Sequence, residues 1–458
     1  MDPIITREED LKGYFETGSK PRDRWGIGLE YERAGVFRDS GRAVPYEGPN
    51  SVETLLQNLS KNAGWSSIQE GGRIIGLSKG GARVTLEPGA QMELSGAVHR
   101  GLATMREELA SYLSAVEEIS RPHGIAWLGI GVQPFTPLDE VGFIPKKRYA
   151  IMREYLPRRG SRAHIMMKQT CGIQINLDYS SETDAADKMR TAMALSPLLT
   201  ALYANSPIYE GRTTGFMSYR AWAWRDTDPD RCGLLPFVFK DGAGFQDYLE
   251  YALDVPMFFV VRGEEYRPAG GLTFRKFIKK GFEGERATVD DWEVHLSTLF
   301  PEVRLKKYIE VRSTDSGEPA SCLALAALLK GILYDGASRR HAWELVRDMT
   351  FKERERLLDD VCRLGPAARL PAQSAAKGEG AGAVPVRALL IDLVRLARQG
   401  LNNQGSPEES EYLTLLDRRL GGEGGCPAAR LAADWEGSMG RNPLKVVEAL
   451  SQTQVEVA

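Results

Sequence analysis

Two stretches decide the fold: Thr85-Leu-Glu-Pro-Gly-Ala-Gln-Met-Glu-Leu-Ser-Gly96 and, earlier in the chain, Gly28-Leu-Glu-Tyr-Glu32. Side chains in a strand alternate between two faces, so Glu30 and Glu32 share one face of the first strand. Carboxylates two residues apart on one face repel each other and are unfavourable in strands. A bound cation would remove that cost, which makes these acids candidate metal ligands.

The later stretch repeats this pattern around a turn. Gln91 and Glu93 share a strand face after Pro88-Gly89, and Glu87 stands just before the turn. Oxygen ligands of this kind suit Mg²⁺, which commonly enters phosphate chemistry together with ATP. The alternative is that these acids form the solvated outer faces of two amphipathic strands. Because a third acidic segment follows, we favour metal binding, with the ligands Glu30, Glu32, Glu87 and Glu93.

The third acidic segment spans residues 302–312. Glu310 and Arg312 are two residues apart in a predicted strand and therefore share a face. A carboxylate beside a guanidinium is commonly just a surface ion pair. Beside a phosphate-handling metal site the pair gains a use, because the carboxylate can hold Mg²⁺ while the arginine binds developing phosphate charge. We therefore predict catalytic roles for Glu310 and Arg312, with Glu310 as a further metal ligand.

Two other segments carry candidate ligand-binding groups. The stretch Cys171-Gly-Ile-Gln-Ile-Asn-Leu-Asp178 alternates strictly, which puts Gln174 and Asn176 on one face, where amides suit a nucleotide. The alternative there is an ordinary half-exposed strand. The stretch Tyr219-Arg-Ala-Trp-Ala-Trp-Arg225 lies in a predicted loop region, residues 206–244. Its arginines and tryptophans form a candidate clamp for a substrate carboxylate, although structural packing of the tryptophans explains them equally well.

Bulk composition points to a cytoplasmic enzyme. The chain has 458 residues, 42% of them hydrophobic, and a formal charge of −3, which gives no electrostatic reason to expect nucleic acid as a partner. No apolar run reaches transmembrane length, and the N-terminus lacks the basic and apolar regions of a signal peptide. Five widely spaced cysteines without a CxxC argue against a disulfide framework and a zinc site.

Short strands that carry acids, followed by runs of helices, predict an α+β fold rather than a doubly wound one. A long helix fits residues 99–123, where apolar side chains recur every three or four positions. Residues 365–384 are rich in Ala, Gly and Pro and read as a flexible connection. We therefore predict a catalytic domain over residues 1–364 and a helical C-terminal region over residues 385–458 that packs on it.

The motifs resemble the plant-type branch of glutamate–cysteine ligases, within a superfamily of carboxylate–amine ligases related to glutamine synthetase. Matching segments follow one another in the family's order from about residue 25 to about residue 334. They include Leu86-Glu-Pro-Gly-Ala-Gln-Met-Glu-Leu-Ser-Gly96, Arg148-Tyr-Ala-Ile-Met-Arg153, Asp226-Thr-Asp-Pro-Asp-Arg231, Tyr251-Ala-Leu-Asp-Val-Pro-Met257 and Phe300-Pro-Glu-Val-Arg-Leu-Lys306. The resemblance implies a central antiparallel sheet that forms a cradle for ATP and Mg²⁺.

The resemblance also implies roles for individual residues. The family keeps metal carboxylates at positions that match Glu30, Glu32, Glu87, Glu93 and Glu310. Gln174 matches a polar side chain near the nucleotide or metal, with Asn176 beside it, and Arg312 matches an arginine near the transferred phosphate. Arg220 and Tyr251 match positions that hold the glutamate substrate, and Trp222 joins them as a candidate.

The chain departs from the plant pattern in two places. Residues 266–286, which match a hairpin with a regulatory cysteine pair, contain no cysteine, and the helix over residues 99–121 lacks the cysteine expected to pair with Cys322. We therefore expect no redox switch of the plant type. After Arg312 the chain reads Ser313-Thr-Asp-Ser-Gly317, where the plant pattern has glycine and then alanine. If that loop borders the acceptor pocket, the identity of the amine is open.

The expected reaction is ATP-dependent formation of γ-glutamylcysteine through γ-glutamyl phosphate, the first step of glutathione-type thiol biosynthesis. The alternatives are a related ligase that joins glutamate to another amine, and a non-catalytic protein on the same scaffold. Small molecules are the expected partners, namely glutamate, ATP and cysteine or another amine, with no nucleic acid or membrane. The protein is expected to be a monomer or a homodimer.

Overall fold

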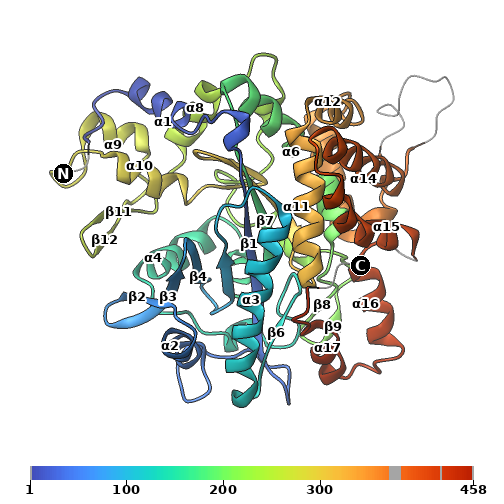
Figure 1. Ribbon diagram of the computed structural model, residues 1–458. Helices are drawn as coiled ribbons and strands as arrows, with labels where there is room; N and C mark the ends of the chain where they lie inside the picture. The colour runs from blue at the N-terminus through green and yellow to red at the C-terminus, as the bar shows by residue number, and fades with distance from the viewer. Residues whose placement is uncertain (1–2, 371–382, 423–424, 456–458) are drawn as a thin grey trace.

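The computed structural model describes residues 3–370, 383–422 and 425–455 and has the predicted α+β architecture (Figure 1). Its centre is a nine-stranded sheet in which all paired neighbours run antiparallel. Eight strands follow one another across the sheet in the order β14 (Val303–Leu305), β15 (Ile309–Asp315), β7 (Gly172–Leu177), β1 (Ile27–Phe37), β5 (Met92–Ser95), β4 (Ala82–Leu86), β3 (Arg73–Lys79) and β2 (Ser66–Glu70).

The eleven-residue strand β1 organises the sheet. Its first half pairs with β7 on one side and its middle pairs with β5 on the other. Its last residues pair with the ninth strand, β6 (Ile125–Leu128). These partner strands come from distant parts of the chain. Pairing with β1 therefore brings their side chains together with those of β1 on the two faces of the sheet.

One face of the sheet is apolar and covered by helices. Leu29 and Tyr31 of β1, like Ile173 and Ile175 of β7, are fully buried on this face. The long helices α3 (Leu102–Ser120), α6 (Glu182–Tyr203) and α11 (Pro319–Tyr334) form the covering layer (Figure 1). Burial of these side chains in one continuous core fixes the strand register, since a slip by one residue would turn them to the other face.

Shorter elements surround this core. The remaining helices before residue 370 are α1 (Lys12–Glu16), α2 (Val52–Asn62), α4 (Lys147–Tyr155), α5 (Ala163–Gln169), α7 (Tyr219–Trp224), α8 (Phe245–Asp254), α9 (Phe274–Lys280), α10 (Val289–Leu296), α12 (Gly336–Glu344) and α13 (Phe351–Leu364). Three two-stranded pairs complete the body: β8 (Ile208–Tyr209) with β9 (Arg212–Thr213), β10 (Cys232–Gly233) with β13 (Phe300–Pro301), and β11 (Phe259–Arg262) with β12 (Glu265–Pro268).

The helix α7 corrects the loop predicted for residues 206–244. It begins after Ser218, whose hydroxyl accepts a hydrogen bond from the Ala221 N–H and so supplies an N-cap. The helix has only six residues, too few for a periodic pattern to stand out in the sequence. This change from loop to helix decides which side chains of the segment point together.

The C-terminal helices form the red end of the chain in Figure 1, where the first two pack on α11 and the last contacts β6. They are α14 (Val386–Asn403), α15 (Thr414–Gly421), α16 (Pro427–Glu436) and α17 (Pro443–Leu450). α11 and α14 touch backbone to backbone, because a methyl group at Gly331 would collide with the Ala397 carbonyl and one at Gly400 with the Gly331 carbonyl.

The predicted flexible connection over residues 365–384 falls partly outside the described residues, at 371–382. Its described ends are packed: Ala368 and Leu370 are buried, and the Leu370 N–H donates to the Val384 carbonyl at 2.8 Å. Within the described part of the chain, no single helix has both the length and the apolar character needed to span a membrane.

Candidate active site

The face of the sheet opposite the helices carries the acids. In the register of β1 and β5, Glu32 stands directly opposite Glu93, and in that of β1 and β7, Glu30 stands opposite Gln174. Direct partners in a sheet project from the same face, so all four side chains point the same way. The alternation seen in the sequence therefore puts Glu30 and Glu32 on the polar face of the sheet.

This face forms the floor of a cleft with a volume of about 580 Å³. Glu87 enters the cleft from the turn after β4, opposite the basic side chain of Arg148 on α4. The cleft is lined by most of the predicted site residues: Glu30, Glu32, Glu87, Glu93, Gln174, Asn176, Arg220 and Arg312.

The glutamates of the cleft are unusually hard to ionise. Only 9% of Glu32 and 8% of Glu93 is exposed, and burial together with neighbouring carboxylates raises the pKa of both. Burial, with repulsion from Glu310 and Glu93, raises the pKa of Glu30 to about 7. The pKa of Glu87 is also raised by burial, against the pull of Lys146 and Arg148. Burial and mutual repulsion thus disfavour the charged forms of all four glutamates.

The donor set fits Mg²⁺ in chemistry. All four carboxylates are hard oxygen ligands, and the buried Asn176 Oδ1 next to Glu30 has no hydrogen-bond partner among the described residues. The described residues contain no group of three or more His, Cys, Asp or Glu side chains already gathered around one point for a metal ion. The carboxylates therefore need to draw closer to bind one ion together.

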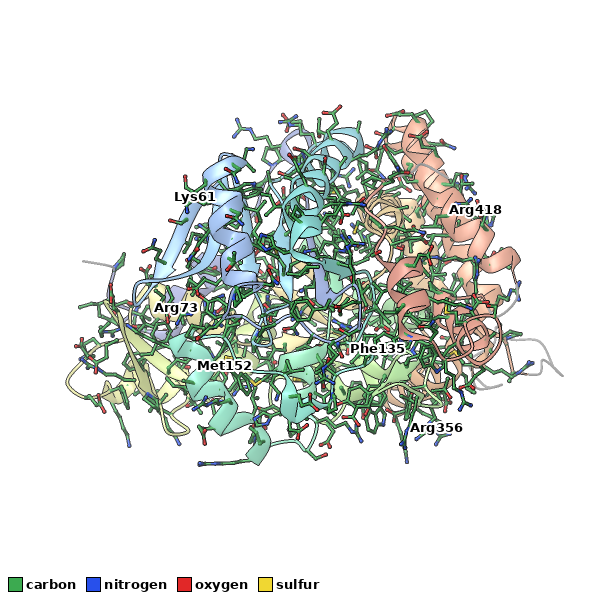
Figure 2. All side chains as sticks on the ribbon, turned by 90° about the horizontal axis from the view of Figure 1, so that it is seen from below. Lys61, Arg73, Phe135, Met152, Arg356 and Arg418 are labelled. Atoms are coloured by element: carbon green, nitrogen blue, oxygen red, sulfur yellow. The ribbon has the colours of Figure 1, made fainter. Side chains whose placement is uncertain are left out.

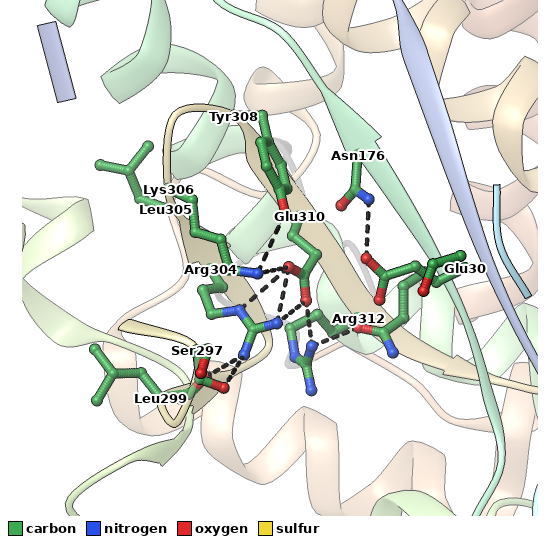
Figure 3. Close-up of polar contacts among 12 residues, drawn as sticks. Glu30, Asn176, Ser297, Leu299, Arg304, Leu305, Lys306, Tyr308, Glu310 and Arg312 are labelled. Atoms are coloured by element: carbon green, nitrogen blue, oxygen red, sulfur yellow. Dashed lines mark hydrogen bonds and ion pairs between the residues drawn. The ribbon is translucent and has the colours of Figure 1, made fainter. Parts of the chain in front are cut away.

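Glu310 has a different environment from the other acids (Figure 3). It is fully buried, and its carboxylate accepts hydrogen bonds from Arg304 at 2.6 and 2.9 Å and pairs with Lys306 at 3.2 Å and with Arg312. These three cations hold its pKa well below the ordinary value, against the effect of burial.

This environment differs from the one expected of a metal ligand, and the role of Glu310 as a metal ligand stays a prediction. It does not line the cleft, and its oxygens are already occupied by cations. The sequence could not reveal this, because Arg304 lies opposite Glu310 only in the register of β14 and β15. In this structure Glu310 anchors basic side chains that themselves line the cleft.

Arg312 and the amides connect the charged groups of the floor. The Arg312 guanidinium donates to Gln174 Oε1 and to Glu310 Oε1, while Gln174 Nε2 donates to Glu32 at 3.0 Å. Asn176 Nδ2 donates to Glu30 at 3.0 Å (Figure 3). The amides predicted to bind a nucleotide thus hold the orientation of acids and of Arg312 across the strands.

Arg220 reaches the cleft from α7 and is only 5% exposed. Its Nη2 donates to the Arg312 carbonyl at 3.0 Å, and its buried Nε has no partner among the described residues. Its backbone N–H donates to the Ser206 hydroxyl, which in turn donates to Asp315 at 2.6 Å. A buried guanidinium with an unused donor is well suited to receive a ligand carboxylate.

Two predicted substrate residues lie outside the cleft. The Trp222 ring packs against the rings of Phe216 and Tyr219 and under Arg162, whose Cζ is 3.5 Å from the ring centre. Tyr251 of α8 packs in another aromatic group, and its hydroxyl donates weakly to the Arg231 carbonyl at 3.4 Å. Neither residue is among those that line the cleft.

Several further residues line the cleft; Trp224 belonged to the candidate clamp, and the others carried no predicted role. Trp224 lines the cleft four residues after Arg220, on the same side of α7, and its ring lies 6.0 Å from the Arg220 guanidinium. Arg148, Arg304 and Lys306 line it as well. Arg304 and Lys306 are two residues apart just before the acidic strand, and this alternation of basic residues could have drawn attention to them. Charge alone, however, does not show whether their side chains face the cleft.

Solved structures share this fold. A glutamate–cysteine ligase from Francisella tularensis, determined in complex with AMP, superposes with a TM-score of 0.59 over 93% of this chain and 88% of that chain, at 13% identity. A bifunctional glutathione synthetase from Pasteurella multocida superposes with a TM-score of 0.50 over 99% of this chain and 53% of that chain, at 15% identity. At such identities these likenesses establish the fold alone.

Curated relatives are much closer in sequence. Chloroplastic glutamate–cysteine ligases from Nicotiana tabacum and Arabidopsis thaliana are each 39% identical to this chain, over 98% and 97% of it, and the matches cover 84% and 83% of those proteins. The prediction of a cytoplasmic protein is wrong by this comparison, because these relatives are named chloroplastic.

The model of the glutamate–cysteine ligase family 2 matches residues 26–445, from the first strand of the cleft to the last helix. This match covers the sheet, the acids of its polar face and the C-terminal helices together. The chain therefore belongs to the glutamate–cysteine ligase family 2.

Proposed function

We propose that this enzyme is an ATP-dependent glutamate–cysteine ligase that forms γ-glutamylcysteine. The observation that carries the proposal is the cleft itself, in which four repelling glutamates face the guanidinium groups of Arg220 and Arg312. The acids offer a place for cations that accompany a polyphosphate, and the arginines offer places for a carboxylate and a phosphoryl group. The family and the names of the curated relatives support the same reaction.

In the proposed reaction, a γ-carboxylate oxygen of glutamate attacks the γ-phosphorus of ATP, and ADP leaves. The product is γ-glutamyl phosphate, whose acyl carbon is then attacked by the amine of cysteine. The carbon–oxygen bond to phosphate breaks, phosphate leaves, and the amine loses a proton. Positioning and charge neutralisation provide most of the rate enhancement in such phosphoryl and acyl transfers.

Each side chain has a proposed task. Arg220 binds the α-carboxylate of glutamate through its unused donor, and Arg312 contacts the transferred phosphoryl group. Gln174 and Asn176 hold Arg312 and Glu30 in place. Glu30, Glu32, Glu87 and Glu93 would hold Mg²⁺, which when bound neutralises phosphate charge. All these residues lie in the proposed catalytic region, residues 1–364.

The amine is proposed to be cysteine. In the segment after Arg312, Thr314 and Ser316 are fully buried, and their hydroxyls donate to the Ile173 and Glu32 carbonyls. Ser313 instead lines a small hollow together with the cleft residues Arg220 and Arg312. The departure at Thr314 is therefore a difference in core packing and gives no specific support to a different acceptor.

The test is ADP release with ATP, Mg²⁺ and glutamate in the presence of a panel of amines, with products identified by mass. We expect a product of the mass of γ-glutamylcysteine only when glutamate and cysteine are both present. If the enzyme forms a product with another amine in preference to cysteine, the assignment of cysteine as the acceptor is wrong, but the enzyme is still an ATP-dependent ligase. No ADP with any amine would overturn the proposal.

A further inference from the structure

A second cavity, larger than the cleft, lies between the C-terminal helices and the catalytic body. Its volume is about 1100 Å³, and it shares no lining residue with the cleft. Helices α15, α16 and α17 supply most of its wall, and Gly129, Asn205 and Glu318 of the body complete it. Pockets that bind small molecules commonly measure about 300–1,000 Å³, so this space is large enough for one.

The wall combines an apolar surface with basic groups. Leu415, Leu431, Met439 and Leu450 give the apolar part. Arg418, Arg419 and Arg430 are the basic part. Arg418 is exposed and has no ion pair with any described residue, while Arg430 pairs with Asp434 at 3.5 Å and Arg419 with Glu318 at 2.9 Å. An apolar wall beside a free cation suits a molecule that has both an apolar body and a negative charge.

Two buried polar groups of the wall lack partners. The Arg419 side chain is 9% exposed, and its Nη1 makes no hydrogen bond with any described residue although its Nη2 is paired. Asn205 is 3% exposed, and its Oδ1 is likewise unpartnered among these residues. Native proteins leave few buried polar atoms unsatisfied, so each such atom calls for an explanation. An anionic oxygen for Arg419 and a hydrogen-bond donor for Asn205 would satisfy both.

We propose that this cavity is a second ligand site, separate from the active cleft, for a small organic anion with an apolar body. The anionic group pairs with Arg418 and Arg419, and the apolar body packs against the leucines of α15 and α16. The active cleft differs from this cavity, because it combines four glutamates with several arginines and shares no lining residue with it. The two sites therefore select different ligands.

The probe is 8-anilinonaphthalene-1-sulfonate, an aromatic sulfonate whose fluorescence rises in apolar surroundings, titrated into the full-length enzyme. We expect saturable binding of one equivalent that excess ATP and glutamate do not displace. N-phenyl-1-naphthylamine, which lacks the sulfonate, should bind roughly tenfold more weakly. Binding displaced by ATP, or no saturable binding, would overturn the proposal.

Charge reversal locates the site. Arg418→Glu should weaken binding of the sulfonate by roughly tenfold, because it replaces the free cation of the wall with an anion. Lys61→Glu is the matched control: Lys61 is also exposed and unpaired among the described residues, and it lies at the far side of the molecule from Arg418 (Figure 2). Equal weakening in the two variants would mean that net charge alone governs binding, and would count against this site.

Filling the cavity gives an independent test. Ala433 of α16 lines the cavity, whereas its neighbour Ala432 does not, so Ala433→Trp should block binding and Ala432→Trp should not. Melting temperatures of both variants report whether they fold. If Ala433→Trp fails to fold, Arg418→Glu decides, since it changes an exposed side chain. Unchanged binding in a folded Ala433→Trp variant would overturn the proposal.

Discussion

Glu32 and Glu93 stand directly opposite each other in the ladder of β1 and β5, and both are more than nine-tenths buried. Like charges at directly opposite positions destabilise a sheet, and burial adds to the cost. Burial and the neighbouring carboxylates raise the pKa of both side chains, so ionising the pair without a cation is unfavourable. The sheet thus gives up stability at the place where the proposed chemistry needs negative charge.

Glu93→Gln separates the effect of the glutamate on stability from its effect on turnover. Its oxygen can still accept from the Thr85 and Ser95 hydroxyls, so the metal-free protein should melt at the same or a higher temperature. Turnover should fall by about 10²–10³-fold, or about 3–4 kcal/mol in the transition state, by analogy with the loss of one preorganised charge-stabilising contact. Steady-state kinetics at saturating Mg²⁺ and thermal melting in EDTA check both parts. Turnover near that of the wild type would contradict the metal assignment.

Glu310→Gln should behave differently. It leaves Arg304, Lys306 and Arg312 without their shared anion in a buried place, and breaking a buried ion pair costs about 3–5 kcal/mol. We expect a clear loss of unfolding free energy in urea with or without Mg²⁺. Glu293→Gln, which breaks the half-exposed pair with Lys307, is the control and should cost about 1 kcal/mol or less. Equal effects would show that Glu310 is not the anchor of this cluster.

Arg220→Lys should raise the KM for glutamate about tenfold or more, with a much smaller change for ATP. An ammonium group cannot reproduce the fork of a guanidinium toward a carboxylate. Kinetics with each substrate varied in turn provide the measurement. Trp222→Phe is the control, because Trp222 packs outside the cleft and should affect melting more than either KM. A parallel rise in both KM values for Arg220→Lys would argue for a packing role instead.

His295 should give stability a dependence on pH. Burial lowers its pKa to about 4, and its Nε2 lies 2.7 Å from the Ala252 carbonyl. Between the two pKa values the unfolded chain binds a proton at His295 and the folded chain does not. The free energy of unfolding is therefore highest above the ordinary pKa of histidine and falls as the pH drops toward 4. Between about pH 7.5 and about pH 5 this residue alone should cost about 2 kcal/mol.

His295→Gln keeps an N–H donor and should remove that part of the pH dependence. Urea unfolding at both pH values measures it, with the exposed His341→Gln as the control. If the free energy of unfolding changes between the two pH values as much in this variant as in the wild type, His295 is not the source of the pH dependence.

Reducing agent should leave activity and apparent size unchanged. All five cysteines are free in the structure, and Cys171, Cys322, Cys362 and Cys426 are buried. Activity assays and size-exclusion chromatography with and without dithiothreitol provide the comparison. A marked loss of activity on reduction would reveal a disulfide that the structure does not contain.

The sequence predicted the polar face of the sheet well because strand alternation is a local property. Glu30 with Glu32, and Gln174 with Asn176, follow from the two-residue repeat alone. The cation cluster around Glu310 was out of reach, since it depends on which residue of β14 lies opposite which residue of β15. Trp222 lies outside the cleft for a related reason: in a helix, residues two apart face different directions, so Trp224 and not Trp222 accompanies Arg220 into the cleft.

The close contact of α11 and α14 at Gly331 and Gly400 determines how the protein responds to cleavage of its backbone. Because Gly331 and Gly400 let the two backbones touch, α14 covers the outer side of α11 closely. Cleavage between residues 370 and 383 would therefore yield a nicked protein whose two fragments stay associated until denatured. Expression of residues 1–370 alone would instead expose that helix and produce an aggregating fragment, which separate expression of the missing piece should rescue by complementation.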